Sequence, residues 1–245
     1  MSQQALWISV SSSLKKFHRP LLKSLSSRTT VREWEYQQGS DEASDLNIPL
    51  TLLHDYLKST NYPFHLIGHS TGGIVALLYA ARYPERVKSL TLLGVGVHPL
   101  MDWHAHYYAY RQLLPCSREI VLAQMVRALF GCQNPSRTKH LVQLLDEDLK
   151  TTPSPHSLFE RSTMKPKQLS CPVLVCGSED DMIVDPCAIA GWENYFKPED
   201  QIWQGSQGYH FFHYFYPQMV GKEILKFQQK INQQPAKHSL IHKQT

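Results

Sequence analysis

The segment from residue 64 to residue 97 constrains the fold more than any other part of the chain. Two short apolar runs, 64–68 and 87–97, flank a turn of small residues and an apolar helical segment, 74–82. Continuous apolar runs of this length are typical of strands that are buried on both faces of a parallel sheet. The order strand, helix, strand therefore predicts an α/β fold with a mainly parallel sheet.

The same alternation continues on both sides of this segment. Further strands are expected at residues 5–10, 29–36, 172–176 and 201–203. Further helices are expected at residues 14–25, 48–57, 186–196 and 217–231. Counting the runs predicts a six-stranded sheet that is flanked by helices.

The strand pattern is absent between residues 98 and 169. Apolar residues follow helical spacing there at 107–114, 120–130 and 139–149. We therefore expect an α/β core formed by residues 1–97 and 170–231, a helical insertion at 98–169, and a polar tail at 232–245.

The composition favours a globular protein with one core and argues against a nucleic-acid-binding or membrane-spanning protein. Apolar residues make up 42% of the 245 residues, which is enough for one sizeable core. The 25 basic and 21 acidic residues leave a net charge of +4 that is spread along the chain, so nucleic-acid binding is not expected. No apolar run approaches the ~18 residues that a membrane span needs.

The N-terminus and the cysteines indicate a cytoplasmic protein. The first lysines follow a short apolar stretch, whereas a secretory signal carries its positive charges before the apolar segment. The five cysteines form no CxxC pair and show no zinc spacing, and the close histidine pairs lack an HExxH context. We expect free thiols in a reducing compartment, no metal site and no cofactor.

The turn at residues 68–72 reads Gly-His-Ser-Thr-Gly, which matches the G-x-S-x-G motif. A turn this sharp strains the backbone of the serine, and it needs glycines so that strand and helix do not collide. The hydroxyl of Ser70 then rises above the sheet edge, beside the free N–H groups of the next helix. The context predicts that Ser70 is a nucleophile, the alternative being a turn that serves packing only. His69 is expected to point away from the reaction site and to serve packing or to support the site indirectly.

With this motif in this context, the chain resembles the α/β-hydrolase family, and closely its compact members known from cyanobacterial genomes. The resemblance runs from Leu6 over nearly the whole chain and is loosest in the helical middle. It implies an α/β-hydrolase fold in which the helical insertion is the cap. Because the chain starts almost at the third strand of the family, the first two family strands are expected to be missing.

The resemblance also implies a triad in the chain order serine, acid, histidine. Asp180 and Asp181 both fit the G-x-x-D-x-x-V turn of the family, and the D-x-I-V context favours Asp181. The segment 208–213 is similar to the G-x-H-F-x-H turn of the family, whose first histidine corresponds to His210. His213 is expected to begin the following helix or to face the pocket.

The oxyanion hole departs from the family pattern. Thr71 is expected to offer its backbone N–H as one donor. The family usually supplies the second donor after His-Gly at the end of its third strand, whereas this chain has Ser9-Val10-Ser11 there. The backbone N–H of Ser11, or that of Ser12, is the expected replacement.

These features predict a serine hydrolase that cleaves a carboxylic ester or thioester. A group of apolar and aromatic residues in the insertion either lines a pocket for a partly apolar small-molecule substrate or forms the core of the insertion itself. This group consists of Trp103, Tyr107, Tyr108, Tyr110, Leu113, Leu114, Met125, Leu129 and Phe130. Acyl transfer by the same triad and a non-catalytic ligand-binding protein on the same scaffold are the alternatives.

Overall fold

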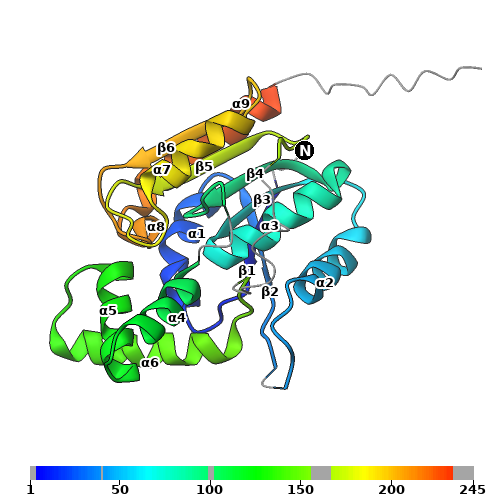
Figure 1. The fold of residues 1–245 in the computed structure, drawn as a ribbon. Helices are drawn as coiled ribbons and strands as arrows, with labels where there is room; N and C mark the ends of the chain where they lie inside the picture. The colour runs from blue at the N-terminus through cyan, green and yellow to red at the C-terminus, as the bar shows by residue number, and fades with distance from the viewer. Residues whose placement is uncertain (1–3, 40, 99–101, 156–166, 234–245) are drawn as a thin grey trace, which may run out of the picture.

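Six parallel strands form the central sheet of the computed structural model, which describes residues 4–39, 41–98, 102–155 and 167–233 (Figure 1). The strands lie in the order β2-β1-β3-β4-β5-β6, and each neighbouring pair is parallel. Their bounds are β1 Gln4–Ser9, β2 Thr30–Glu35, β3 Phe64–His69, β4 Val87–Leu93, β5 Val173–Ser178 and β6 Gln201–Gly205. All six fall on the runs predicted from the sequence, and within the described residues no strand precedes β1.

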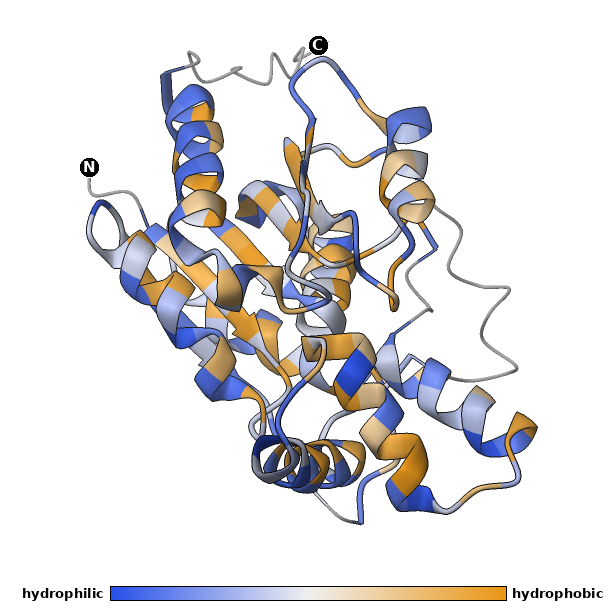
Figure 2. Cartoon of the chain, turned by 90° about the vertical axis from the view of Figure 1, so that its left-hand side faces the viewer, coloured by the Kyte–Doolittle hydropathy of each residue, from blue (hydrophilic) through white to orange (hydrophobic). Residues whose placement is uncertain are grey.

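Helices cover both faces of this sheet. The helices α1 (Arg19–Ser26) and α9 (Pro217–Gln233) pack together on one face, where their apolar residues meet alternate residues of the strands, such as Trp7 and Ile67. The helices α2 (Asn47–Lys58) and α3 (Ser70–Arg82) pack on the other face against the remaining strand residues. Figure 2 shows the resulting pattern, with apolar residues on the strands and on the inner sides of the helices.

Short helical elements complete the core. Three are 3-10 helices, η1 Lys15–Phe17, η2 Pro84–Arg86 and η3 Gly191–Tyr195, and two are short α-helices, α7 Pro186–Ala190 and α8 Phe212–Phe215. The predicted helix at 14–25 is thus split into η1 and α1, with Pro20 in the first turn of α1. The predicted last helix continues to Gln233, while the rest of the predicted tail lies outside the described residues.

The insertion consists of three helices, α4 (Trp103–Leu113), α5 (Arg118–Phe130) and α6 (Pro135–Thr151), which lie at one end of the sheet (Figure 1). Each begins at a side chain that accepts a backbone N–H, namely Asp102, Ser117 and Asn134. Of the apolar and aromatic residues named above, Trp103, Tyr107, Met125, Leu129 and Phe130 are buried, whereas Leu113 is 76% exposed. The buried ones belong to the same hydrophobic core cluster as residues of the sheet.

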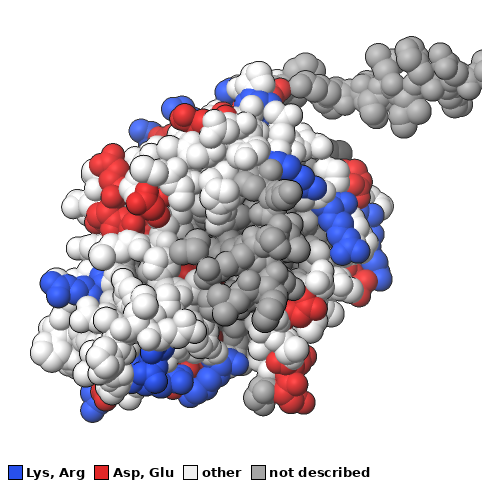
Figure 3. All heavy atoms as spheres, in the orientation of Figure 1, with Lys and Arg blue, Asp and Glu red and all other residues white. Residues whose placement is uncertain are grey.

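The surface and the cysteines complete the description. Figure 3 shows basic and acidic side chains in several small groups of either sign on the face in view. All five cysteines are free, with Cys171 and Cys176 buried. Within the described part of the chain, no helix combines the length and the apolar character needed to cross a bilayer.

Candidate active site

Ser70 stands where β3 ends and α3 begins, with a backbone φ of +50°. This left-handed conformation is costly for a residue with a side chain, and it is held here by the close packing of the turn. A Cβ on Gly68 would lie 2.6 Å from the carbonyl oxygen of Gly72, and a Cβ on Gly72 would lie 2.5 Å from that of Ile8. The two glycines therefore permit strand β3, helix α3 and the end of β1 to meet at one point.

His210 and Asp181 come together from the loops that follow the last two strands. The Nδ1 of His210 lies 2.9 Å from Oδ2 of Asp181, and both side chains are buried. The other oxygen of Asp181 accepts the backbone N–H groups of Ile183 and Val184, at 2.8 and 3.1 Å. The carboxylate is therefore fixed on both sides, and it orients the imidazole so that Nε2 is the free ring nitrogen.

Asp180 has different partners from its neighbour. Its carboxylate accepts the backbone N–H of Gly208 at 3.2 Å and that of Tyr209 at 2.7 Å, together with the hydroxyl of Ser178 at 2.6 Å. Tyr209 is the second residue other than glycine with a positive φ, at +54°. Asp180 thus holds the strained loop that carries His210, while Asp181 contacts the imidazole itself.

A small cavity of about 20 Å³ joins these groups. Ser70 and His210 both line it, and within the described residues neither Ser70 Oγ nor His210 Nε2 has a hydrogen-bond partner although both atoms are buried. Unpaired buried polar atoms are rare and are retained where function uses them. Apolar side chains form much of the remaining wall, among them Ile8, Val10, Leu14, Trp103 and Phe211.

His69 lies against His210 and lines the cavity, so it does not point away from the site, whereas its packing against His210 agrees with the expected packing or supporting role. Its Nε2 lies 2.9 Å from the backbone carbonyl oxygen of His210, to which it donates. Burial, and then the neighbouring imidazoles, hold the pKa of His69 well below its usual range, so the ring is neutral. The neutral ring fixes the backbone position of His210.

His18 and His213 complete a buried group of imidazoles with His69. The Nδ1 of His18 lies 3.0 Å from Nε2 of His213, and burial lowers the pKa of His18 to about 4 and that of His213 well below its usual range. One ring nitrogen from each of the three residues lies within 4.8 Å of the others, a grouping of donors that a metal ion can use. His213 belongs to α8 and does not line the cavity beside Ser70, since its contacts are to the other imidazoles and to aromatic rings.

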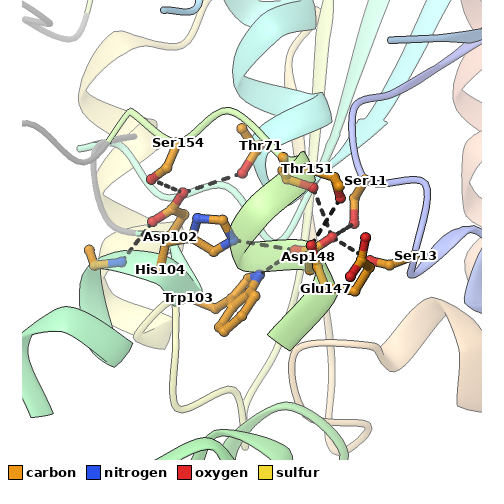
Figure 4. Close-up of polar contacts among 12 residues, drawn as sticks. Ser11, Ser13, Thr71, Asp102, Trp103, His104, Glu147, Asp148, Thr151 and Ser154 are labelled. Carbon is orange, nitrogen blue, oxygen red and sulfur yellow. Dashed lines mark hydrogen bonds and ion pairs between the residues drawn. The ribbon is translucent and has the colours of Figure 1, made fainter. Parts of the chain in front are cut away.

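The two residues expected in the oxyanion hole, Thr71 and Ser11, both line the cavity. Their hydroxyls contact two carboxylates of the insertion that the sequence analysis did not identify (Figure 4). Thr71 Oγ1 donates to Asp102 at 3.3 Å, and Ser11 Oγ donates to Asp148. The only sequence signal for Asp102 is its place as the N-cap of α4, and Asp148 is one of three consecutive acidic residues.

Asp148 is a buried carboxylate with five donors. Oδ1 accepts the hydroxyls of Ser11, Ser13 and Thr152, and Oδ2 accepts Trp103 Nε1 at 3.1 Å and His104 Nε2 at 3.3 Å. Burial alone would raise the pKa of Asp148, but the bond and charge of His104 and the serine hydroxyls lower it on balance. Burial likewise opposes the charge on His104, yet the bond to Asp148 raises the pKa of this imidazole. The two groups form a buried ion pair.

Comparison with known proteins agrees with this fold. The family described as alpha/beta hydrolase fold matches residues 57–131. An uncharacterized protein of Nostoc sp. (strain PCC 7120) is 44% identical over 236 residues, covering 96% of this chain and 94% of that protein. One of Synechocystis sp. (strain PCC 6803) is 39% identical over 234 residues, covering 96% and 93%. The carboxylesterase CesB of Bacillus subtilis, at 17% identity, superposes with a TM-score of 0.67 over 92% of this chain and 83% of that one.

The chain belongs to the α/β-hydrolase fold family. It has the fold of this family, with a six-stranded, all-parallel sheet and a helical insertion between β4 and β5.

Proposed function

We propose that this protein is a serine hydrolase that cleaves a carboxylic ester or thioester, with Ser70 as nucleophile, His210 as general base and Asp181 as the residue that orients it. One observation carries the proposal. The imidazole of His210 is bonded to Asp181 through one nitrogen and has its other nitrogen unpaired, in the same cavity as the unpaired hydroxyl of Ser70. This is the set of roles that nucleophilic catalysis by serine requires.

The reaction follows from these roles in two steps. In the first, His210 takes the proton of Ser70 as Oγ attacks the carbonyl carbon, and it then gives this proton to the leaving alcohol or thiol. In the second, His210 takes a proton from water, which attacks the acyl-enzyme, and returns the proton to Ser70 as the acid leaves. The Asp181 carboxylate stabilises the imidazolium in both steps.

The residues around the cavity also suggest where the oxyanion and the apolar part of the substrate would bind. The negative charge that develops on the carbonyl oxygen is proposed to lie at the N-terminus of α3, where Thr71 N–H and a backbone N–H of the β1 loop at Ser11 donate to it. Ile8, Val10, Leu14, Trp103 and Phe211 give the cavity an apolar wall. An apolar acyl or alkyl part is therefore the proposed partner of this wall.

Labelling with a fluorophosphonate tests the nucleophile, because this probe reacts with activated serines only. We expect stoichiometric labelling of the wild type, no labelling of Ser70→Ala, and strongly slowed labelling of His210→Gln. Ser27→Ala, which removes an exposed hydroxyl in the turn after α1, is the matched control and should label like the wild type. A folded wild type that does not react would contradict the proposal and favour a non-catalytic ligand-binding protein.

A series of p-nitrophenyl esters from acetate to decanoate tests the substrate class. Release of p-nitrophenol with a burst that equals the labelled sites indicates an acyl-enzyme. Longer apolar acyl chains should raise kcat/KM relative to acetate if the apolar wall receives them. Addition of an alcohol or amine that collects the acyl group in place of water would show acyl transfer instead of hydrolysis.

A further inference from the structure

We propose that two buried carboxylates of the insertion, Asp148 and Asp102, position the two segments of the oxyanion hole, so that the helical insertion controls the rate of the chemical step. This inference rests on the proposed function, since it concerns the oxyanion of that reaction. We call the two carboxylates the carboxylate clamp. Neither touches the reacting atoms in the proposed mechanism, so both are positioning residues.

Asp148 holds the first segment, which is the loop that follows β1. Ser11 and Ser13 both donate their hydroxyls to Oδ1 of Asp148, the second at 2.7 Å (Figure 4). The family resemblance implies a glycine in this loop, where Ser9-Val10-Ser11 stands instead. Without the glycine the loop needs another means of holding a backbone N–H toward the oxyanion. The hydrogen bonds from the hydroxyls of Ser11 and Ser13 to Asp148 hold the loop in place instead.

Asp102 holds the second segment, which is the first turn of α3. Its Oδ2 accepts the hydroxyl of Thr71 at 3.3 Å and that of Ser154 at 2.8 Å, and Oδ1 accepts the N–H of Ala105 at 2.9 Å. Asp102 therefore joins the residue after the nucleophile to the beginning of α4. Both segments of the oxyanion hole are thus bound to the insertion by side chains, in addition to their own backbone contacts.

The burial of Asp148 supports a positioning role. Its side chain is 1% exposed, and a buried carboxylate is costly unless donors surround it. Its five donors come from the β1 loop, from α4 and from the residue after α6, so the carboxylate connects three separate elements at one point. The neighbouring His104 compensates its charge, so the carboxylate does not oppose the oxyanion that forms across the cavity.

Three variants test the clamp. Asp148→Asn removes the charge, Ser11→Ala removes one hydroxyl of the β1 loop, and Thr71→Val removes the contact to Asp102 while keeping the backbone N–H. Each should lower kcat for a p-nitrophenyl ester by about tenfold or more, with KM changed less than about threefold, because an oxyanion donor acts in the transition state. Affinity for a trifluoromethyl ketone, which forms a tetrahedral adduct, should fall in parallel with kcat/KM.

Matched controls separate positioning from stability. Glu147→Gln changes an exposed carboxylate on the same helix, and Thr151→Ala removes a hydroxyl that bonds the backbone of that helix. Both should keep kcat within about twofold of the wild type. Ser11→Thr and Thr71→Ser retain the hydroxyls and should restore most of the rate lost in the first set. Each rate is divided by the concentration of active sites, which fluorophosphonate labelling gives. Thermal midpoints are measured for every variant.

The outcomes distinguish this inference from the proposed function. A wild type that neither cleaves esters nor reacts with the fluorophosphonate overturns both. An active wild type together with Ser11→Ala and Thr71→Val variants that keep the kcat per active site overturns the clamp alone. If Asp148→Asn does not fold, the two hydroxyl variants decide the question. Variants that lose stability but keep both kcat and affinity for the ketone also overturn it.

Discussion

At the scale of single residues, the turn that carries Ser70 depends on close contacts between the main chains of β1 and α3. The carbonyl oxygen of Ile8 approaches Gly72 so closely that a methyl group at this glycine would lie 2.5 Å from it. The neighbouring atom belongs to a strand of the central sheet and cannot turn aside as a flexible side chain does. The turn that holds Ser70 at its positive φ is therefore sensitive to the smallest added side chain.

Gly72→Ala tests this sensitivity. We expect the substitution to reduce the free energy of unfolding by about 1–3 kcal/mol through overpacking, and to slow fluorophosphonate labelling because Ser70 is displaced. Urea unfolding and the labelling rate measure the two effects. Gly39→Ala is the control, since its added methyl would meet a flexible side-chain oxygen of Asp41 at 3.1 Å. Equal stability of the two variants would contradict the prediction.

The two adjacent aspartates also permit a test at this scale. Asp181→Asn should lower kcat by about 10³–10⁴-fold, because an amide favours the wrong tautomer of His210. Asp180→Asn keeps an acceptor for the loop N–H groups, and we expect about a tenfold loss at most. Steady-state kinetics on an activated ester measure both variants. If Asp180→Asn has the larger effect, the assignment of the triad acid is wrong.

At the scale of elements, the buried pair His104–Asp148 joins α4 to α6. The raised pKa of His104 means that its contribution to stability is complete below pH 6.5 and is lost as the pH rises through the folded pKa. The lowered pKa of Asp148 means that its contribution is present above pH 3.8 and is lost as the pH falls through the folded pKa. The pair therefore contributes its full stabilisation of the insertion between pH 3.8 and pH 6.5.

The pH dependence of unfolding tests this pair. The thermal midpoint of the wild type should exceed that of His104→Gln by an amount that shrinks as the pH rises from 6.5 through the folded pKa of His104. The comparison is made between the two proteins because the buried neutral imidazoles of His18, His69 and His213 gain stability in the same pH range and are common to both. Below pH 6.5 the variant should be less stable because Asp148 remains buried without its cation, a loss of about 3–5 kcal/mol. Calorimetry across this range measures both. A wild type and variant with parallel profiles would contradict the ion pair.

The elements show which features the sequence could predict. The strands β1, β3, β4 and β5 were predictable because apolar runs buried on both faces need no knowledge of distant contacts. The edge strands β2 and β6 are mostly exposed or half-buried, and they were predictable from β-branched and aromatic residues such as Val31, Trp34 and Ile202. The short helix α8 was missed because Phe212–Phe215 is too short to show a period. The start of α6 was placed late, although Asn134 followed by Pro135 is a readable signal.

The candidate site was predictable only in part, for a physical reason. Ser70 stands in a turn whose flanking glycines mark it, whereas His210 was singled out by the resemblance of residues 208–213 to a turn of the family. In the row Asp146, Glu147, Asp148 the three side chains carry the same charge, yet only Asp148 faces inward. Its donors lie as far as 137 residues away along the chain, and no local pattern records such contacts.

At the scale of the whole molecule, the sheet ends in the edge strands β2 and β6. An uncovered edge can pair with another chain, and charged side chains on it oppose this. Strand β2 carries Arg32, Glu33 and Glu35 among its six residues, and the last is paired with Lys15 at 2.5 Å. The charged side chains of β2 therefore oppose the pairing of this edge strand with a strand of a second protein molecule.

Removal of two of these charges tests the edge. Arg32→Thr combined with Glu33→Thr leaves the net charge unchanged and raises the strand propensity of β2. We expect self-association at concentrations where the wild type sediments as a single smaller species. Asp55→Thr with Lys58→Thr on α2 is the control, since it removes a surface ion pair that belongs to a helix and not to a strand. Identical sedimentation of both double variants would contradict this role.

The arrangement of the site along the chain has a consequence for biosynthesis. Ser70 leaves the ribosome early, whereas Asp181 and His210 follow only after the insertion has been made. Under the proposed mechanism, the serine has neither its base nor the partner that orients it until the last strands join the sheet. The proposed mechanism therefore implies that the growing polypeptide does not attack esters of the cell before the C-terminal segments have folded.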